Sequence, residues 1–166
     1  MSIMRCTTEQ ATDIRKILKQ RHGWTSRQVS VRARYFSMGS AIDCEIRDPA
    51  VALSAVQAVA SRAESIASCA VTGEILGGGN TYIHVRYSAA VEAVMSQRYA
   101  GAVAAALAKI ESGSNALEPV GATGFHVGRP NEWRASLWDD GGHVREGGVD
   151  ELAYVIARNI LERTRA

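Results

Sequence analysis

Apolar and polar residues alternate in two short runs between residues 29 and 47 of the chain. A period of two places successive side chains on opposite faces of a β-strand. The expected buried positions are Val29, Val31, Ala33, Ile42, Cys44 and Ile46. The expected exposed positions are Ser30, Arg32, Arg34, Asp43, Glu45 and Arg47. The two runs predict a β-hairpin with arginines on one strand and carboxylates on the next, and such opposite charges favour one antiparallel register.

Longer segments with apolar residues at helical spacing predict four helices. They are expected from Thr7 to about Arg21, from Asp48-Pro49 to about Cys69, from Ser88 to about Ile110, and from Asp150 to Arg163. Thr7 and Gln10 have the spacing of a capping box, and Gly23 suits the C-cap of the first helix. The third helix is expected to bury Val91, Val94, Met95, Val103 and Leu107.

Glycine-rich turns separate the remaining extended runs. Val71–Leu76 and Thr81–Tyr87 are expected to form a second hairpin around Gly77-Gly78-Gly79-Asn80. Three later strands are expected at Gly124–Val127, Glu132–Trp138 and His143–Glu146, with a turn at Asp139–Gly142. Hairpins joined to helices predict an α+β fold, with a mostly antiparallel sheet packed against helices. A C-terminal β-rich segment and a terminal helix complete it.

The composition of residues 111–124, rich in Gly, Ser, Asn and Pro, is typical of a linker or long loop. Residues 1–110 are then an α-β-β-α-β-β-α core domain. Residues 125–166 are a β-hairpin plus C-terminal helix, which we expect to pack on the core. A chain of 166 residues is long enough to bury a core of its own.

The net charge of +2 argues against an acidic mimic of nucleic acid and falls short of a strongly basic binder. The charge is uneven, because residues 1–47 carry +5 and residues 48–166 carry −3. Any contact with a polyanion should therefore favour the N-terminal third.

Cysteine usage and hydropathy predict the cellular setting. Cys6, Cys44 and Cys69 are odd in number and form no CxxC pair, which favours free thiols in a reducing compartment. The sequence has no run of about 18 apolar residues and no apolar centre of a signal peptide near its start. We therefore expect no membrane contact and a cytoplasmic protein.

No pattern in the sequence indicates catalysis. The four histidines, His22, His84, His126 and His143, lack metal-ligand spacing, although their convergence in space stays open. The glycine run is followed by Asn80 and Thr81 and lacks the lysine of a phosphate-binding loop, so it predicts a turn. We expect no enzymatic activity, no cofactor and no bound metal.

The stretch VSVRARYFSMGSAIDCEI resembles domains of large polyvalent proteins of phages and conjugative elements. The supporting residues are IRKILKQRHG before it, the turn Tyr35–Ser40, the strand start Ile42-Asp43 and the later block GEILGGGNTYIHVRYS. The resemblance covers roughly residues 8–110. It implies an accessory protein of a mobile genetic element, similar in role to anti-CRISPR or anti-restriction inhibitors. It carries over no catalytic residue.

Six residues are candidate contacts for a partner. They are Arg32, Arg34, Tyr35, Phe36, Trp138 and Arg145. Arg32, Arg34 and Tyr35 could join Arg15, Lys16, Lys19 and Arg27 in a basic patch with an aromatic residue. The alternative is a solvated face on which Arg32 and Arg34 pair with Asp43 and Glu45. Trp133 is expected in the core, whereas Trp138 has the opposite parity and is either an exposed interface anchor or covered by the last helix.

Two functions follow from these residues. The first is a non-catalytic accessory protein that binds a host defence complex and inhibits it sterically. The second is a nucleic-acid-binding accessory protein that uses the basic N-terminal third. The sequence leaves the oligomeric state open.

Overall fold

The computed structural model describes residues 6–37, 39–75, 79–113, 116–131 and 134–163. The chain forms an α+β fold that divides into two compact units, Met1–Ser88 and Ala89–Ala166. We call them the first unit and the second unit. This division differs from the expected one at residues 111–124, because the third helix packs within the C-terminal unit.

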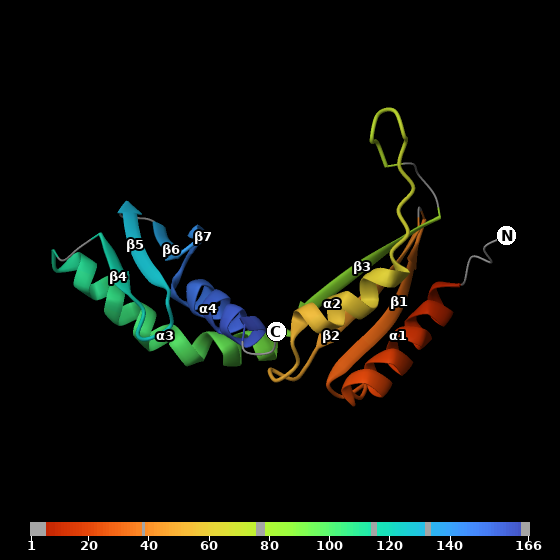
Figure 1. Ribbon diagram of the computed structural model, residues 1–166, viewed down its shortest axis with the longest axis horizontal. Coiled ribbons are helices and arrows are strands. Elements are labelled where there is room, and N and C mark those ends of the chain that lie inside the picture. The colour runs from red at the N-terminus through yellow and green to blue at the C-terminus, as the bar shows by residue number, and fades with distance from the viewer. Residues whose placement is uncertain (1–5, 38, 76–78, 114–115, 132–133, 164–166) are drawn as a thin grey trace. The chain divides into compact units, whose positions relative to one another are not determined.

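The first unit is a three-stranded sheet with two helices (Figure 1). Its elements are α1 (Thr7–His22), β1 (Val29–Phe36), β2 (Gly39–Ile46), α2 (Leu53–Ala60), the 3-10 turn η1 (Ser61–Ala63) and β3 (Asn80–Tyr87). The predicted first hairpin is confirmed, because β1 and β2 pair antiparallel with Val31 opposite Cys44 and Arg32 opposite Asp43.

The predicted second hairpin is wrong. β3 pairs in parallel with β2, and the chain between them crosses over through α2. Residues 71–75 form no strand, and Val71 is 91% exposed. Their closest approach to strand pairing is one isolated bridge between Ser68 and Ile75. Of the predicted turn, Gly77 and Gly78 lie outside the described residues.

The ends of the first two helices also differ from the prediction. The N-cap of α1 is Cys6 instead of Thr7, and the Cys6 backbone N–H donates to Glu9 Oε2 at 3.3 Å. Gly23 is the expected left-handed C-cap, with φ of 70°. The second helix begins at Leu53 and ends at Ala60, far short of Cys69, because Ser65 leaves the helical path to bridge Thr81.

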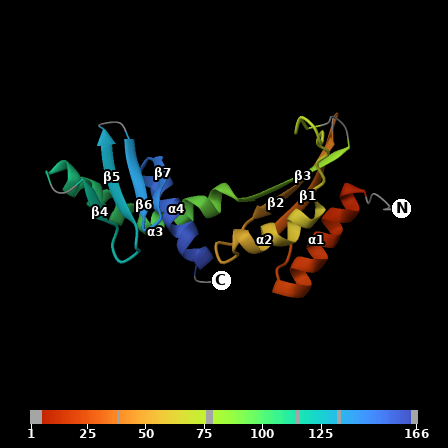
Figure 2. The same cartoon turned by 45° about the horizontal axis from the view of Figure 1, so that its top comes forward.

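Both helices of the first unit cover the same face of its sheet. α1 packs on β1 and β2, α2 packs on β2 and β3, and the two helices contact each other. Figure 2 shows α1 and α2 side by side against the three strands. The fully or nearly fully buried side chains on this face include Ile14, Leu18, Val31, Ile42, Ile46 and Val56. Their burial supplies the main stabilising free energy of this layer.

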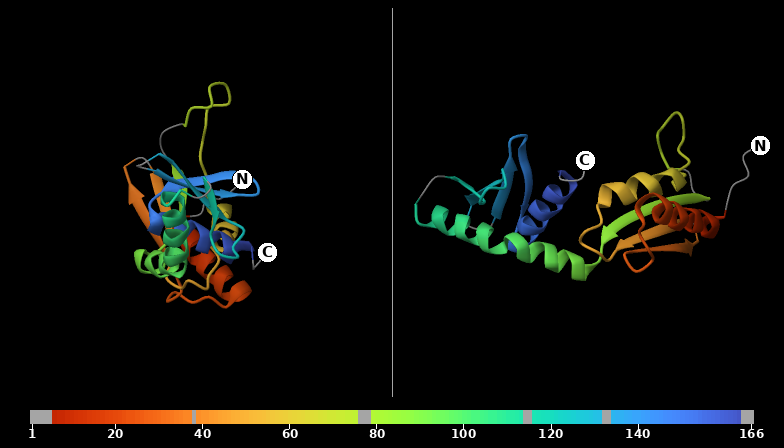
Figure 3. Two further views of the ribbon diagram at one scale, coloured as in Figure 1. Left: turned by 90° about the vertical axis from the view of Figure 1, so that its left-hand side faces the viewer. Right: turned by 60° about the horizontal axis from the view of Figure 1, so that its bottom comes forward.

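The second unit is an antiparallel sheet in the order β4-β5-β6-β7 with two helices. Its elements are α3 (Ala89–Glu111), β4 (Leu117–Pro119), β5 (His126–Asn131), β6 (Arg134–Asp139), β7 (Gly142–Gly147) and α4 (Val149–Arg163). β6, β7 and the last helix agree with the prediction to within two residues, whereas β5 runs on to Asn131, four residues beyond the predicted end at Val127. The predicted linker, in contrast, contains the short strand β4 (Figure 3).

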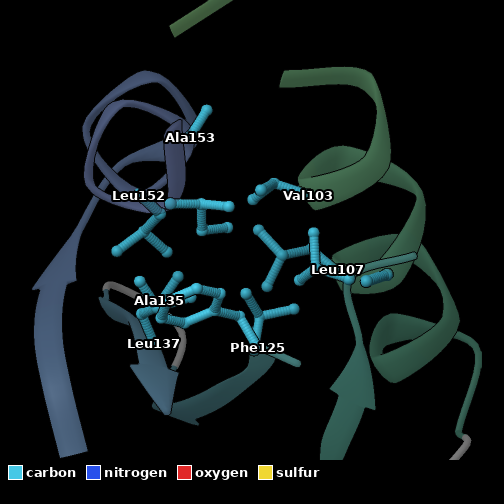
Figure 4. Close-up of a cluster of buried hydrophobic side chains, with 11 residues drawn as sticks. Val103, Leu107, Phe125, Ala135, Leu137, Leu152 and Ala153 are labelled. Atoms are coloured by element: carbon cyan, nitrogen blue, oxygen red, sulfur yellow. The ribbon is translucent and has the colours of Figure 1, made fainter. Parts of the chain in front are cut away.

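The core of the second unit lies between the sheet and the two helices (Figure 4). Val103 and Leu107 of α3 meet Leu152 of α4 above Phe125 and Leu137. Val91, Met95, Val103 and Leu107 are buried as predicted. Val94 is exposed, so that part of the prediction is wrong. The prediction for Trp133 lies outside the described residues.

Candidate binding surface

The face of the first sheet that α1 and α2 leave uncovered carries the candidate site. Alternation along the strands places one set of side chains there. This set, the open face, consists of Arg32, Arg34, Phe36, Ala41, Asp43, Glu45, Tyr82, His84 and Arg86. Strand register aligns these residues in rows, with Arg32, Asp43 and His84 forming the central row. Three strands separated in the sequence therefore build one surface.

Asp43 connects the two outer strands of the open face. Its Oδ2 accepts from Arg34 Nε at 3.1 Å, and its Oδ1 lies 3.0 Å from His84 Nδ1. The Asp43 side chain is 32% exposed and that of Arg34 is 59% exposed. Such exposed pairs contribute little to stability, about 0–1 kcal/mol each. They do fix where the guanidinium and the imidazole lie.

Glu45, the other carboxylate of the open face, pairs with Arg47 rather than with Arg32. Arg47 Nε donates to Glu45 Oε1 at 2.8 Å, and this hydrogen bond lowers the pKa of Glu45. The positive charges of Arg86 and Arg32 lower that pKa further. Of the ion pairs that the sequence suggested between Arg32 or Arg34 and the carboxylates of β2, the pair of Arg34 with Asp43 is therefore present. Among the described residues, Arg32 forms no ion pair within 4.0 Å.

An aromatic pair lies at one end of the open face. The rings of Phe36 and Tyr82 stack with centroids 6.1 Å apart and an interplanar angle of 27°. Arg34 Cζ lies 6.0 Å from the Phe36 centroid, within the range of a cation–π contact. Phe36 stays 43% exposed. The Tyr82 hydroxyl accepts a hydrogen bond from Asn80 Nδ2 at 3.3 Å, which holds the ring in place.

Tyr35, the fourth predicted contact of the hairpin, points away from the open face. Its parity is that of Val31, and its hydroxyl reaches the start of α1. There it lies 2.8 Å from Thr8 Oγ1 and 3.2 Å from Cys6 Sγ. Arg15 also lies on the helix side, where its Nε and Nη2 donate to the Val31 carbonyl at 3.1 and 2.6 Å. Neither residue therefore extends the open face.

The last two predicted contacts belong to the second unit. Trp138 follows the buried Leu137, so it lies on the sheet face away from α3 and α4, and it is 36% exposed. Its ring meets His143 edge-on, with centroids 5.2 Å apart. Arg145 donates to Glu151 Oε1 of α4 through both Nε, at 2.9 Å, and Nη2. The six predicted residues thus fall in three places, and only Arg32, Arg34 and Phe36 share a surface.

Tyr82, His84 and Arg86 are residues of the open face that the sequence analysis missed as candidates. Their alternation with Ile83, Val85 and Tyr87 was the available signal. The predicted hairpin with Val71–Leu76 paired this strand with the wrong neighbour, so it gave these residues no position relative to Arg32 and Arg34. The parallel pairing of β3 with β2 brings them together.

The thiols and histidines of the described residues lie in different surroundings. Burial raises the pKa of Cys44 to about 12, whereas a hydrogen bond with the Thr72 side chain lowers that of Cys69 to about 7. His22 stacks on Trp24 with centroids 4.3 Å apart. No group of three or more His, Cys, Asp or Glu side chains in the described ranges could hold a metal ion. No helix there is long and apolar enough to cross a bilayer.

Comparison of the chain with protein-family models, curated proteins and solved structures finds no match. The resemblance to domains of mobile elements therefore stays a prediction that rests on the residues quoted for it. The open face itself is the feature from which a function can be inferred.

Proposed function

We propose that the chain is a non-catalytic accessory protein that binds a macromolecular partner through the open face of its first unit. The observation that carries the proposal is the gathering of Arg32, Arg34 and Arg86 with an exposed aromatic pair on a face that no helix of that unit covers. Arginine and aromatic side chains are enriched where proteins bind macromolecules. The strands are fixed from behind by the buried Ile42 and Ile46, so the surface is presented rigidly.

Two partner classes follow from the sequence analysis. In the first, the protein blocks a host defence complex by covering one of its subunit-binding or nucleic-acid-binding surfaces. The resemblance to mobile-element domains supports this class and its cytoplasmic setting. In the second, the partner is nucleic acid. The open face supports the second class, because guanidinium groups there outnumber carboxylates and an exposed ring lies beside them.

A capture experiment tests the proposal. The tagged full-length chain is incubated with bacterial lysate, with and without nuclease, and the retained molecules are identified by mass spectrometry. The matched pair of variants is Arg32→Glu/Arg34→Glu on the open face and Arg134→Glu/Arg158→Glu in the second unit. Both change the net charge equally, and all four side chains are exposed.

We expect a stoichiometric partner that the open-face variant loses and the control variant keeps. Retention of the same partner by both variants would contradict the proposal. A nuclease-resistant defence protein would support the inhibitor, and loss of the partner on nuclease treatment would support nucleic acid.

A further inference from the structure

We infer that the occupant of the open face is a single strand of nucleic acid, with one base stacked on Phe36. The inference rests on the proposed function, since it takes the open face as the binding surface and names the chemical class that fits it. Three features of the face support it: an accessible ring, a row of guanidinium groups and the position of the carboxylates.

The accessible ring provides a place for a base. Every nucleobase has a π-face, and stacking on an exposed aromatic side chain is tolerant of sequence. Phe36 offers 43% of its surface to solvent and is backed by Tyr82 at 6.1 Å. Arg34 lies 6.0 Å from the Phe36 centroid, where it could reach the phosphate beside a stacked base. A duplex hides its base faces, so this platform favours an unpaired strand.

The guanidinium groups of the open face extend from the Phe36 ring toward the other end of the sheet. Arg34 and Arg32 follow Phe36 on β1, and Arg86 lies at the far row on β3, opposite Glu45. The rows from Phe36 to Ser30 extend about 20 Å, at about 3.3 Å per residue. Phosphate oxygens accept hydrogen bonds from guanidinium groups, and neutralising them releases counterions. The face therefore offers several phosphate contacts to one extended strand.

The balance of charge supports the same occupant. Three arginines of the open face, Arg32, Arg34 and Arg86, stand against its two carboxylates Asp43 and Glu45, and Arg47 follows directly after β2. The first unit carries eleven Lys and Arg against seven Asp and Glu, a net charge of +4, whereas the second unit carries −2. Positive potential is thus concentrated in the unit that presents the open face.

Asp43 makes the inference distinguishable from a protein interface. It lies at the centre of the face, where it forms an ion pair with Arg34 and lies 3.0 Å from His84 Nδ1. Toward a phosphate chain this carboxylate is repulsive, so Asp43→Asn should strengthen binding of nucleic acid. Toward a protein surface that matches the present charge pattern, the same change removes a complementary charge and should weaken binding.

The test is fluorescence anisotropy with the full-length chain and a labelled strand of about 12 nucleotides, compared with its duplex, over a series of salt concentrations. We expect the strand to bind more tightly than the duplex, with an affinity that falls steeply with salt. Phe36→Leu should weaken binding about fivefold or more, while Phe36→Trp should retain it, because tryptophan preserves a stacking surface. Circular dichroism verifies that each variant is folded.

Charge variants complete the test. Arg34→Glu should weaken binding and reduce the salt slope by about one contact. Asp43→Asn should strengthen binding severalfold, and the control Arg158→Glu, in the second unit, should leave it unchanged. Equal binding of strand and duplex, with no effect of Phe36→Leu, would overturn the inference and reduce the face to a general polyanion contact.

The two proposals fail in different ways. Absence of strand binding at about 50 mM salt, together with a nuclease-resistant protein that Arg32→Glu/Arg34→Glu loses from the lysate, would overturn the inference and leave the proposed function standing. Strand binding that persists in the open-face variants would overturn the inference, and retention of the lysate partner by Arg32→Glu/Arg34→Glu as well would overturn the proposed function.

Discussion

Tyr87→Phe is the change that most sharply tests how the first unit is held together. Tyr87 ends β3 and is 2% exposed. Its hydroxyl donates to the Val51 carbonyl at 2.9 Å and accepts from the Leu53 backbone N–H at 3.2 Å. Leu53 is the first residue of α2, so one side chain satisfies backbone groups at the start of the crossover helix.

The expected loss follows from these two hydrogen bonds. Each contributes about 1 kcal/mol net, and leaving a buried backbone group unpaired costs about 1–3 kcal/mol. Phenylalanine fills the same space without the hydroxyl, so packing changes little. We expect Tyr87→Phe to lower the free energy of opening α2 by about 2 kcal/mol, a roughly 30-fold change in the opening equilibrium.

Hydrogen exchange followed by mass spectrometry measures this locally. A local readout is needed because the chain has two compact units, and one global unfolding free energy would mix them. Peptides that cover Leu53–Ala60 should exchange about 30-fold faster, while peptides of the second unit serve as an internal reference. The matched control is Tyr82→Phe, whose hydroxyl accepts only a partly buried bond of 3.3 Å from Asn80 and should change exchange little. Equal exchange of α2 in Tyr87→Phe and wild type would refute the reasoning.

Three further predictions concern two substitutions and one chemical modification. Gly39→Ala would put a Cβ 2.6 Å from the Asn80 carbonyl oxygen, so we expect the first unit to melt at a lower temperature, and an unchanged melting temperature of that unit would count against the β2–β3 pairing. Leu137→Ala removes a fully buried side chain of the second core and should cost about 2–5 kcal/mol in urea unfolding monitored in that unit; a cost under about 1 kcal/mol would contradict its place in the core. Cys69 has a pKa lowered to about 7, so its rate of alkylation should rise as the pH passes about 7, because the reactive thiolate forms above the pKa. Buried Cys44, with a pKa of about 12, should stay unmodified at that pH. A midpoint near pH 9 for the alkylation of Cys69 would contradict this prediction.

The elements that the sequence predicted well are those that depend on neighbours in the chain. The alternation from Val29 to Arg34 and from Ile42 to Arg47 needs only one tight connection to become a hairpin, and its register followed. The helix at Ala89–Glu111 likewise rests on local alanine content and spacing.

The parallel pairing of β3 could not be read from local pattern. A run such as Val71–Leu76 beside a glycine-rich turn has the signature of a hairpin arm. In the structure, β3 gains its partner from β2, more than thirty residues earlier in the sequence. The early end of α2 has the same origin. No proline or glycine stops a helix between Ala60 and Cys69, and the bridge from Ser65 to Thr81 is a tertiary contact.

The β1 part of the candidate site could be predicted from the sequence, and the β3 part could not. Arg34 and Phe36 share a parity, so their common face follows from the strand alone. The same rule places Tyr35 on the opposite face, and grouping it with Arg34 ignored that rule. Tyr82 and Arg86 could join the site only once the strand order was known, because that order decides which faces coincide.

Mapping the binding surface by nuclear magnetic resonance tests the central claim most directly. The isotopically labelled full-length chain is titrated with an unlabelled strand of about 12 nucleotides, and backbone amide shifts are followed residue by residue. Our account predicts that the shifts concentrate at Arg32, Arg34 and Phe36 of β1 and at Tyr82 and Arg86 of β3. Shifts confined to the second unit, or to the solvent side of α1, would contradict it.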